Sequence, residues 1–358
     1  MLKQQIQPSR VGAKHVSIVG FPDTVASTVY GIYDVMSAHA LLDSAQKTGP
    51  RAPFHTEIVG ETPGPLTVSN GIPVLVQRAI EEVTSTDIVI VPSIVLRGPW
   101  EKGRYPRLVS WLKQMHARGA VICSACSGIF LIAETGLFDG KDATVHFGYV
   151  RDFQEAHPTV TVHPERVLVI SGNGDCLVSS GASQSWHDLV LYLVARYTGA
   201  TTAQELARRF ALQWHQEGLT PFMVFEGKSD HGDAEIATAQ KWLSEHFGVA
   251  NPVESVIKRS KLAERTFKRR FVAATGLTPI GYVQRLRIED AKRRLERTDA
   301  SVEEVSWRVG YEDAAFFRRL FRRTTGISPG AYRKRFRMPE FARPGPPSSR
   351  RKASRGSQ

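Results

Sequence analysis

Residues 307–333 read WRVGYEDAAFFRRLFRRTTGISPGAYR, and this stretch decides the fold of the C-terminal third of the chain. When residues 261–285 are laid over residues 311–335, at an offset of 50, 8 of the 25 positions are identical. The identical pairs are Phe267/Phe317, Arg269/Arg319, Phe271/Phe321, Thr275/Thr325, Gly276/Gly326, Pro279/Pro329, Tyr282/Tyr332 and Arg285/Arg335. A repeat of this kind indicates a duplicated structural unit.

The second copy has the pattern of a short helix, a turn and a second helix. The segment from Ser301 to Glu304 is a capping box that predicts a helix start, and Gly310 permits a tight turn before a helix over 314–323. Phe317 and Phe321, four residues apart, fall on one face of that helix. The pattern predicts a helix-turn-helix unit.

The first copy follows the same plan over 253–260 and 264–274. It has Ser260-Lys261 where the second copy has its turn glycine, so we expect a less standard turn. Between the two copies, residues 281–296 are expected to form one connecting helix that fixes the separation of the units. Its inward residues are expected to be Val283, Leu286, Ala291 and Leu295.

Positive charge is concentrated in the same region. The 358 residues include 47 Lys and Arg against 35 Asp and Glu, which gives a formal net charge of +12. Residues 251–358 hold 27 basic and 11 acidic side chains, and the first 250 residues hold 20 and 24. A basic domain of this kind favours an anionic partner such as nucleic acid. The 42% hydrophobic content excludes global disorder, and no stretch approaches the roughly 20 apolar residues of a membrane helix.

The first 200 residues alternate short β-branched runs with longer helical stretches, which is typical of a parallel α/β sheet. The expected strands are 16–21, 54–60, 87–94, 120–125 and 166–172, and the expected helices are 28–46, 73–83, 106–118, 127–136 and 183–199. A doubly wound sheet follows. Because ligands of such sheets lie beyond the carboxyl ends of the strands, the turn after residues 120–125 is where chemistry is expected.

That turn reads Ala125-Cys126-Ser127-Gly128-Ile129-Phe130, a strand that leads directly into a helix. Small residues around the cysteine are typical of a nucleophile elbow, in which a sharp turn exposes the side chain. The following helix N-terminus would favour a thiolate through its partial positive charge.

The segment CSGIFLIAETGLFDGKDATVHF, residues 126–147, resembles the signature of the ThiJ/PfpI superfamily, which has a flavodoxin-like, class I glutamine amidotransferase-like fold. The resemblance places Cys126 at the elbow, Ser127 in the small position after it and His146 at the histidine of the ATxH segment. Thr28 stands where enzymatic relatives carry an acidic residue, and Asp34 matches a later Glu instead. The resemblance therefore implies an inherited pocket that acts as a sensor, and not as a catalytic site.

Three further groups invite a chemical interpretation. His163-Pro164-Glu165 matches the His-Pro-Glu of glutamine amidotransferases, but a loop cap before a strand is the plainer interpretation. Cys123 and Cys126 form a C-x-x-C, yet Cys123 falls within an expected buried strand, and no second pair has metal-ligand spacing. Asp188, beside His187 at the start of an expected helix, is interpreted as a surface or dipole-compensating residue. Neither a metal nor a cofactor is expected.

Over nearly the whole of 235–337, the duplicated region closely resembles the AraC/XylS family of transcription regulators. The resemblance implies an all-α domain whose two recognition helices, about 34 Å apart, read successive major-groove segments of promoter DNA. The expected DNA-binding residues are Arg265, Thr266, Lys268, Arg269, Ala315, Arg318, Arg319 and Arg322. The other basic residues Lys292, Arg293 and Arg294 are expected to contact phosphates or solvent.

The sequence thus predicts an N-terminal extension (1–14), an α/β domain (15–200), a linker region (201–234), a DNA-binding domain (235–337) and a basic disordered tail (338–358). We expect a cytoplasmic transcription regulator that binds double-stranded promoter DNA, recruits or hinders RNA polymerase and answers to an unknown small-molecule effector. A homodimer is a further expectation, and no membrane contact is expected. The alternative is a thiol enzyme, a hydratase, hydrolase or amidase that uses Cys126 and His146, with DNA binding secondary.

Overall fold

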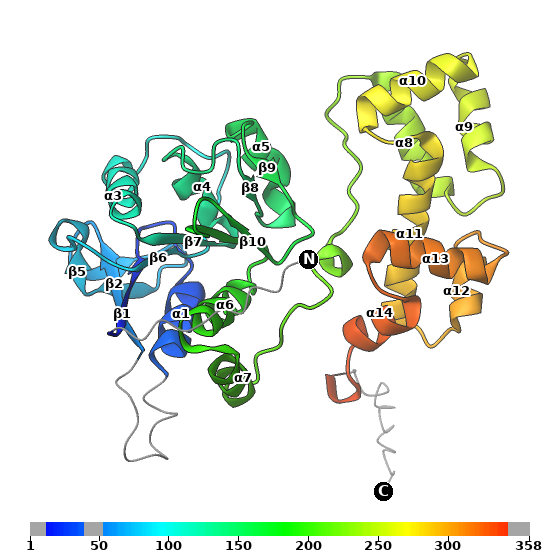
Figure 1. Ribbon diagram of the computed structural model, residues 1–358. Helices are drawn as coiled ribbons and strands as arrows, with labels where there is room; N and C mark the ends of the chain where they lie inside the picture. Colours follow the sequence, from blue (N-terminus) through cyan, green and yellow to red (C-terminus); the bar gives the residue numbers. More distant parts are fainter. Residues whose placement is uncertain (1–11, 39–52, 343–358) are drawn as a thin grey trace, which may run out of the picture. The chain divides into compact units, whose positions relative to one another are not determined.

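The structure is a computed structural model that describes residues 12–38 and 53–342, and it divides into two compact units at Thr220 and Pro221 (Figure 1). The expected N-terminal extension lies mostly outside the described residues, as do residues 39–46 of the first expected helix and residues 343–358 of the expected tail. In the described part of the chain, no helix is long and apolar enough to cross a membrane.

The N-terminal unit is built on a seven-stranded sheet in the order β10-β11-β7-β6-β1-β2-β5. Its strands are β1 (Lys14–Val19), β2 (Phe54–Gly60), β5 (Arg78–Ala79), β6 (Ile88–Val91), β7 (Val121–Ala125), β10 (Leu168–Ser171) and β11 (Leu177–Ser180). Neighbouring strands are parallel except for β10, which pairs antiparallel with β11 at one edge. The central strands β6 and β7 are buried throughout, because helices cover both faces of the sheet.

Helices α1, α6 and α7 cover one face, and α3, α4 and α5 cover the other (Figure 1). Their bounds are α1 (Ala26–Ser37), α3 (Pro106–Ala117), α4 (Ile129–Ala133), α5 (Val150–Ala156), α6 (Trp186–Thr198) and α7 (Ala200–Arg209). Two separate hydrophobic cores result, one on each side of the sheet. The expected doubly wound α/β fold is confirmed.

The expected helix over 73–83 is wrong. Residues Pro73–Val76 form strand β4, which pairs with β3 (Gly64–Thr67) in a separate hairpin, and the chain continues through β5 into a 3-10 turn at Ile80–Glu82. Val74 and Val76 are buried, whereas Leu75 is 57% exposed. This alternation has the period of a strand, and it is too short to be separated from a helical pattern by composition alone.

The C-terminal unit is helical in all its described regular elements. These are α8 (Ala234–His246), α9 (Pro252–Ser260), α10 (Glu264–Thr275), α11 (Pro279–Arg297), α12 (Val302–Arg308), α13 (Ala314–Thr325), α14 (Pro329–Phe336) and short 3-10 turns at Thr220–Phe222 and Glu340–Ala342. The helix pairs expected at 253–260 with 264–274 and at 302 onward with 314–323 are confirmed to within two residues at each end.

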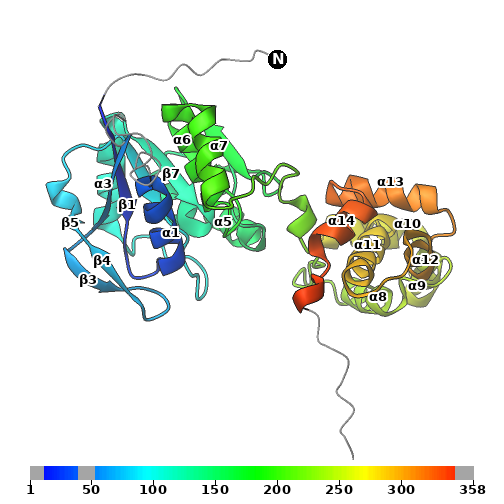
Figure 2. The same ribbon diagram turned by 90° about the horizontal axis from the view of Figure 1, so that it is seen from below.

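Helix α11 runs between the two helix-turn-helix units, and Figure 2 shows the other helices of the unit around it. Its N-terminal half places Tyr282 and Val283 in the core of the first unit. Its C-terminal half places Ile288, Ala291 and Leu295 in the core of the second. Of the four residues expected to face inward, Val283, Ala291 and Leu295 are buried and Leu286 packs partly buried against the first core. One helix therefore belongs to both hydrophobic cores.

Candidate functional site: two helix-turn-helix units and a cysteine turn

In the second helix-turn-helix unit, a side chain caps the N-terminus of each of the two helices. Ser301 Oγ accepts the N–H of Glu304 at 3.0 Å and begins α12. Asp313 Oδ1 accepts the N–H groups of Ala315 and Phe316 at 2.7 and 3.1 Å and begins α13. These two N–H groups, with Arg319 as a smaller cause, lower the pKa of Asp313. Each cap satisfies backbone donors that the first helical turn leaves without a partner.

The turn between these helices depends on a glycine. Gly310 has φ of +91°, a left-handed conformation that L side chains rarely adopt. A Cβ at this position would lie 2.8 Å from the guanidinium of Arg287 and 3.1 Å from the carbonyl oxygen of Gly248. Both the conformation and the lack of space therefore favour glycine.

The first unit turns between its helices with different residues, and its left-handed residue comes one position later in the repeat than Gly310, which aligns with Ser260. Lys261 takes the left-handed conformation at φ of +55°, and Ala263, the residue before α10, provides no capping side chain. The expectation of a less standard turn at Ser260-Lys261 is confirmed, because a non-glycine residue here occupies the left-handed region. The chain pays a conformational cost at Lys261 that the second unit avoids.

The second halves of the two units match closely. Both second helices end at a left-handed glycine, Gly276 and Gly326. The ring of Tyr282 meets Phe271 edge-on at 5.3 Å between centroids, and the ring of Tyr332 meets Phe321 in the same way at 5.5 Å. The repeated residues of the sequence therefore hold repeated contacts in the structure.

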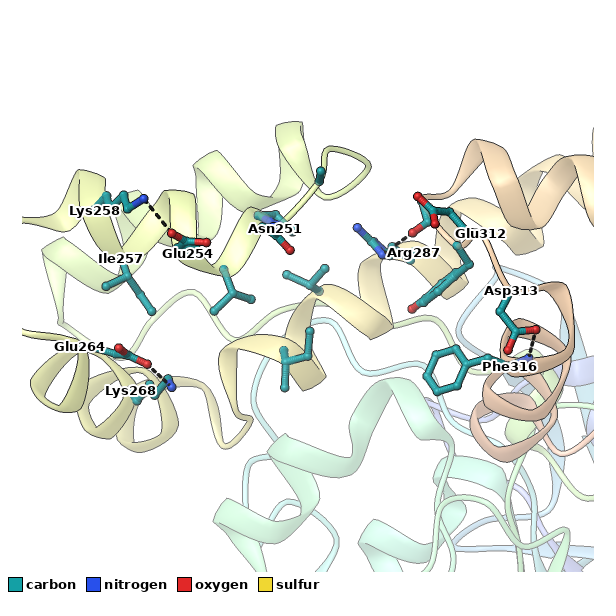
Figure 3. A pocket seen from close by; sticks show the side chains of 17 residues that line it. Asn251, Glu254, Ile257, Lys258, Glu264, Lys268, Arg287, Glu312, Asp313 and Phe316 are labelled. Carbon is teal, nitrogen blue, oxygen red and sulfur yellow. Dashed lines mark hydrogen bonds and ion pairs between the residues drawn. The ribbon is translucent and has the colours of Figure 1, made fainter.

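Arg287 joins the two helix-turn-helix units within the C-terminal unit. From α11 it donates to the carbonyl oxygens of Phe247 at 2.8 Å and Val249 at 3.1 Å, just after α8, and to that of Gly310 at 2.7 Å in the second unit. Its guanidinium also lies over the ring of Tyr311, 5.0 Å from the centroid. Arg287 also borders a cleft of about 830 Å³ between the two helix-turn-helix units (Figure 3). Acidic and basic side chains alternate around this cleft, so it lacks the uniform positive charge of a phosphate site.

Helices α10 and α13 carry most of the residues that were expected to bind DNA. Seven of them are exposed, and Thr266 is half-buried: Arg265, Lys268 and Arg269 on α10, and Ala315, Arg318, Arg319 and Arg322 on α13. Lys268 forms an ion pair with Glu264, and Arg318 forms one with Glu303. Phe267, Phe271, Phe317 and Phe321 occupy the opposite, fully buried faces of the same two helices. Each second helix therefore buries its aromatic face and presents its basic face to the outside.

The expectation for Lys292 is wrong. Its side chain is buried, and Nζ donates to the carbonyl oxygen of Met223 at 2.6 Å while it pairs with Glu289 at 3.0 Å. A buried ammonium is tolerated here because a carboxylate and a carbonyl replace water. Arg293 and Arg294 pair with Asp290 at 3.1 and 2.7 Å, so both are held on α11.

In the N-terminal unit, the turn at Cys126 has the strained backbone of a nucleophile elbow. Cys126 has φ of +53°, a left-handed conformation that is uncommon for a residue with a side chain. The chain here leaves β7 and enters α4 through a short 3-10 turn. A Cβ at Gly128 would lie 2.4 Å from the carbonyl oxygen of Pro92, so the turn packs tightly against the segment after β6.

The surroundings of the Cys126 thiol favour its neutral form. The residue is 2% exposed, and burial raises the pKa of its thiol, while the hydroxyls of Ser183, Ser127 and Ser93 act in the opposite direction. The Sγ lies 3.7 Å from the Ser183 Oγ. Hydroxyl groups thus stand around this thiol. A neutral serine hydroxyl is too weak a base to accept the proton of the thiol.

The other residues of the expected pocket have structural contacts of their own. Ser127 Oγ donates to the carbonyl oxygen of Ile94 at 2.7 Å and accepts its N–H at 2.9 Å, which ties the elbow to the neighbouring loop. His146 Nδ1 accepts the N–H of Gly148 at 3.1 Å, and burial lowers the pKa of its imidazole. Among the described residues, no hydrogen bond joins His146 to Cys126. Thr28 is buried in α1, and Asp34, further along that helix, is exposed.

The remaining candidates separate into different places. His163 Nε2 lies 3.0 Å from Asp142 Oδ1, and its Nδ1 lies 3.8 Å from Glu165, at a partly exposed position. Cys123 is fully buried, and burial raises the pKa of its thiol to about 12. Cys123, Cys126 and Cys176 are all free thiols.

The interpretation of Asp188 as a surface or dipole-compensating residue is wrong for the surface position, although Asp188 does lie in the first turn of α6. Its carboxylate is buried and accepts the N–H of His215 at 3.0 Å on one oxygen, while the other oxygen lies 2.6 Å from His215 Nδ1. His215 is 27 residues away in the sequence, in the segment after α7. The sequence offered no periodic signal for this contact, because residues 211–219 form no regular element there.

In comparison with known protein families, the two units of the chain match different families. A model of the DJ-1/PfpI family matches residues 32–196, and a model of a helix-turn-helix domain matches residues 257–335. Fold and site together define a two-domain protein in which an elbow-bearing α/β domain precedes a duplicated helix-turn-helix domain. The α/β domain is therefore similar to the DJ-1/PfpI family, and the C-terminal domain is similar to a helix-turn-helix domain family.

The HTH-type transcriptional regulator CdhR of Pseudomonas aeruginosa is 27% identical over 325 residues, which cover 85% of this chain and 90% of that protein. The HTH-type transcriptional activator RhaS of Salmonella arizonae is 38% identical over 106 residues, which cover 30% of this chain and 38% of that protein. A solved structure of an AraC family transcriptional regulator from Pseudomonas putida has 17% identity and a TM-score of 0.46, over 55% of this chain and 99% of that one.

Proposed function

We propose that the protein is a sequence-specific DNA-binding transcription regulator. The observation that carries the proposal is the pair of exposed basic helices, α10 and α13, held by one helix that belongs to both cores. A buried aromatic face fixes each of these helices in its unit, and the exposed face is free to enter a major groove. The similarity to proteins named as transcription regulators supports the same function.

The residues in contact with DNA would be Arg265, Thr266, Lys268, Arg269, Ala315, Arg318, Arg319 and Arg322. Arg269 and Arg319 occupy equivalent positions of the repeat, and both side chains are exposed. An exposed guanidinium can bind guanine bidentately. Lys268 and Arg318 would first exchange Glu264 and Glu303 for phosphate or base, which lowers their net contribution.

The N-terminal unit would act as a sensor or an association module. Its elbow retains the strained turn, while the thiol is buried and surrounded by hydroxyls, which suits a ligand pocket better than an acid–base site. The proposal includes binding of a small-molecule effector, contact with RNA polymerase, association with a second copy of the chain and a cytoplasmic location. If an effector alters DNA affinity, DNA must alter effector affinity by the same factor.

The test is the selection of bound fragments from genomic DNA by the full-length protein at stated salt. We expect a discrete site with two boxes about one helical turn apart. Arg319→Ala should lose selectivity at one box and Arg269→Ala at the other, each with about 1–3 kcal/mol of lost discrimination. The control Arg293→Ala, on α11 and paired with Asp290, should keep both boxes. Binding that depends on salt but never on sequence would contradict the proposal.

The rival function is a thiol enzyme that uses Cys126, and the strained φ of +53° is the observation in its favour. Alkylation by iodoacetamide near pH 8 separates the two functions. As a sensor, the folded protein should react at the partly exposed Cys176 before Cys126, because burial keeps the Cys126 thiol protonated. Preferential labelling of Cys126, absent in Cys126→Ser, together with turnover of a nitrile, amide or isonitrile, would instead support the enzyme.

A further inference from the structure

His187, Asp188 and His215 form a cluster that the proposed function leaves unused. In the described part of the chain, this is the group of His, Cys, Asp and Glu whose three donor atoms lie within 4.8 Å of one another. Asp188 Oδ2 lies 2.6 Å from His215 Nδ1 and 3.5 Å from His187 Nε2. The two imidazole rings stack with centroids 5.1 Å apart, so their edges meet the same carboxylate.

We propose that these three residues bind a divalent transition-metal ion of the kind represented by Zn²⁺. Two imidazoles and one carboxylate are a common donor set for such ions, with water completing the coordination. Donor atoms about 2.0–2.2 Å from a tetrahedral ion lie about 3.4 Å from one another. The observed separations bracket this value, so rotations of side chains are sufficient to admit the ion.

The site is built into the structure and shielded from water. The side chains of His187, Asp188 and His215 are 11%, 3% and 14% exposed. Asp188 is held by the backbone N–H of His215 at 3.0 Å through the carboxylate oxygen that does not face the imidazoles. His187 Nε2 also lies 2.8 Å from the carbonyl oxygen of Gln213. The N–H of His215 thus holds Asp188 in position, as outer hydrogen bonds do at metal sites, whereas the Gln213 contact uses the nitrogen that would bind the ion.

Metal binding requires a change of tautomer at both rings and the loss of two hydrogen bonds, from His215 Nδ1 to Asp188 and from His187 Nε2 to the Gln213 carbonyl oxygen. Without a metal, His215 Nδ1 and His187 Nε2 serve as hydrogen-bond donors to the carboxylate and to the Gln213 carbonyl oxygen. When the ion binds these two nitrogens, each ring carries its proton on the other nitrogen, and both imidazoles stay neutral. The ionised carboxylate of Asp188 leaves one positive charge on the site.

The position of the cluster gives the ion a structural consequence. His187 and Asp188 belong to the first turn of α6, whereas Gln213 and His215 belong to the segment that leads to the end of the N-terminal unit at Thr220. Ser183, three residues before α6, is the residue whose hydroxyl lies near the Cys126 thiol. A bound ion would therefore fasten the exit segment to the helix that follows the elbow region.

The test is a Zn²⁺ titration of the full-length, EDTA-treated protein in competition with a chromophoric chelator. We expect one tightly bound Zn²⁺ per chain and a loss of affinity of about 100-fold or more in His215→Gln and in His187→Gln. The matched control is His163→Gln, another histidine paired with a carboxylate, which should bind as the wild type does. Absence of tight binding, or equal binding by all variants, would overturn the proposal.

A spectroscopic measurement on the wild-type protein covers the case in which a variant fails to fold. Co²⁺ in place of Zn²⁺ should give ligand-field bands typical of nitrogen and oxygen donors without a thiolate charge-transfer band. A charge-transfer band would place the metal on a cysteine and overturn the assignment. The outcome is independent of DNA binding, so the metal site and the proposed function can fail separately.

Discussion

The two helix-turn-helix units share a plan but differ in how their turns are stabilised. The second unit has an Asp313 cap and a glycine in the left-handed turn position, whereas the first has Ala263 and Lys261 in these roles. Their second halves carry the same C-terminal glycines and the same Tyr–Phe contacts. The core contacts thus define the fold of each unit, and the turn residues adjust how firmly its second helix is held.

The largest expected effect on stability comes from Arg287, the side chain that joins the two helix-turn-helix units. Arg287→Ala removes three donors and leaves the carbonyl oxygens of Phe247, Val249 and Gly310 without their partner. We expect a loss of about 3 kcal/mol in stability of the C-terminal unit, because three carbonyl oxygens, two of them in partly buried contacts, lose a charged donor at once. Urea unfolding checks the value, and hydrogen exchange should show faster opening of the connection after α8 and of the turn at Gly310. The matched control Arg285→Ala, an exposed arginine on the same helix, should change little.

Gly310→Ala tests the turn of the second unit alone. The added Cβ meets a left-handed φ and the guanidinium of Arg287 at 2.8 Å, so we expect a cost of about 2 kcal/mol. Hydrogen exchange of residues 302–325 should rise while that of residues 252–275 stays close to wild type. Equal loosening of both units would mean that they do not behave as separate units.

A cap exchange sharpens the comparison. Ala263→Ser gives α10 the capping hydroxyl that it lacks, and we expect a gain of about 0.5–1 kcal/mol, measured by thermal unfolding. Asp313→Ala should act in the opposite direction on α13. If Ala263→Ser adds no stability, the backbone at this position does not accept a side-chain cap.

The same cap makes the second unit sensitive to acid. Because the N–H groups of Phe316 and Ala315 lower the pKa of Asp313 in the folded state, its contribution is present above the pKa of the unfolded chain and is lost as pH falls through the folded value. The midpoint temperature of thermal unfolding should therefore fall less steeply between about pH 6 and pH 3 in Asp313→Ala than in the wild type. An unchanged slope would contradict this assignment.

The smallest expected effect is at the turn of the first unit. Lys261→Gly removes the strain of a left-handed lysine at φ of +55° but adds freedom to the unfolded chain. We expect a net gain of about 0.5 kcal/mol by thermal unfolding. If DNA affinity falls at the same time, Lys261 also contacts phosphate, which a parallel binding titration would reveal.

Sequence patterns predicted the helical unit closely, because several of its helix starts and turns depend on local residues such as Ser301 and Gly310. They predicted less of what depends on distant partners. Asp188 became buried through His215, and Lys292 through the carbonyl oxygen of Met223, and neither of these distant contacts is indicated by a local pattern. Residues 73–83 were misread because a four-residue alternation is too short to separate strand from helix. The elbow at Cys126 was predictable from its small residues, but its hydroxyl surroundings were not.

Helix α11 has a consequence for the operator that the protein accepts. Its 19 residues span about 28 Å, and with Arg287 they hold the two basic helices on one continuous rod. One base pair inserted between the two boxes would turn the second box by about 34° around the duplex axis, since a turn holds about 10.5 base pairs. A rod cannot follow that rotation. We therefore expect one base pair inserted between the two boxes to reduce DNA affinity more than one base-pair substitution within a box.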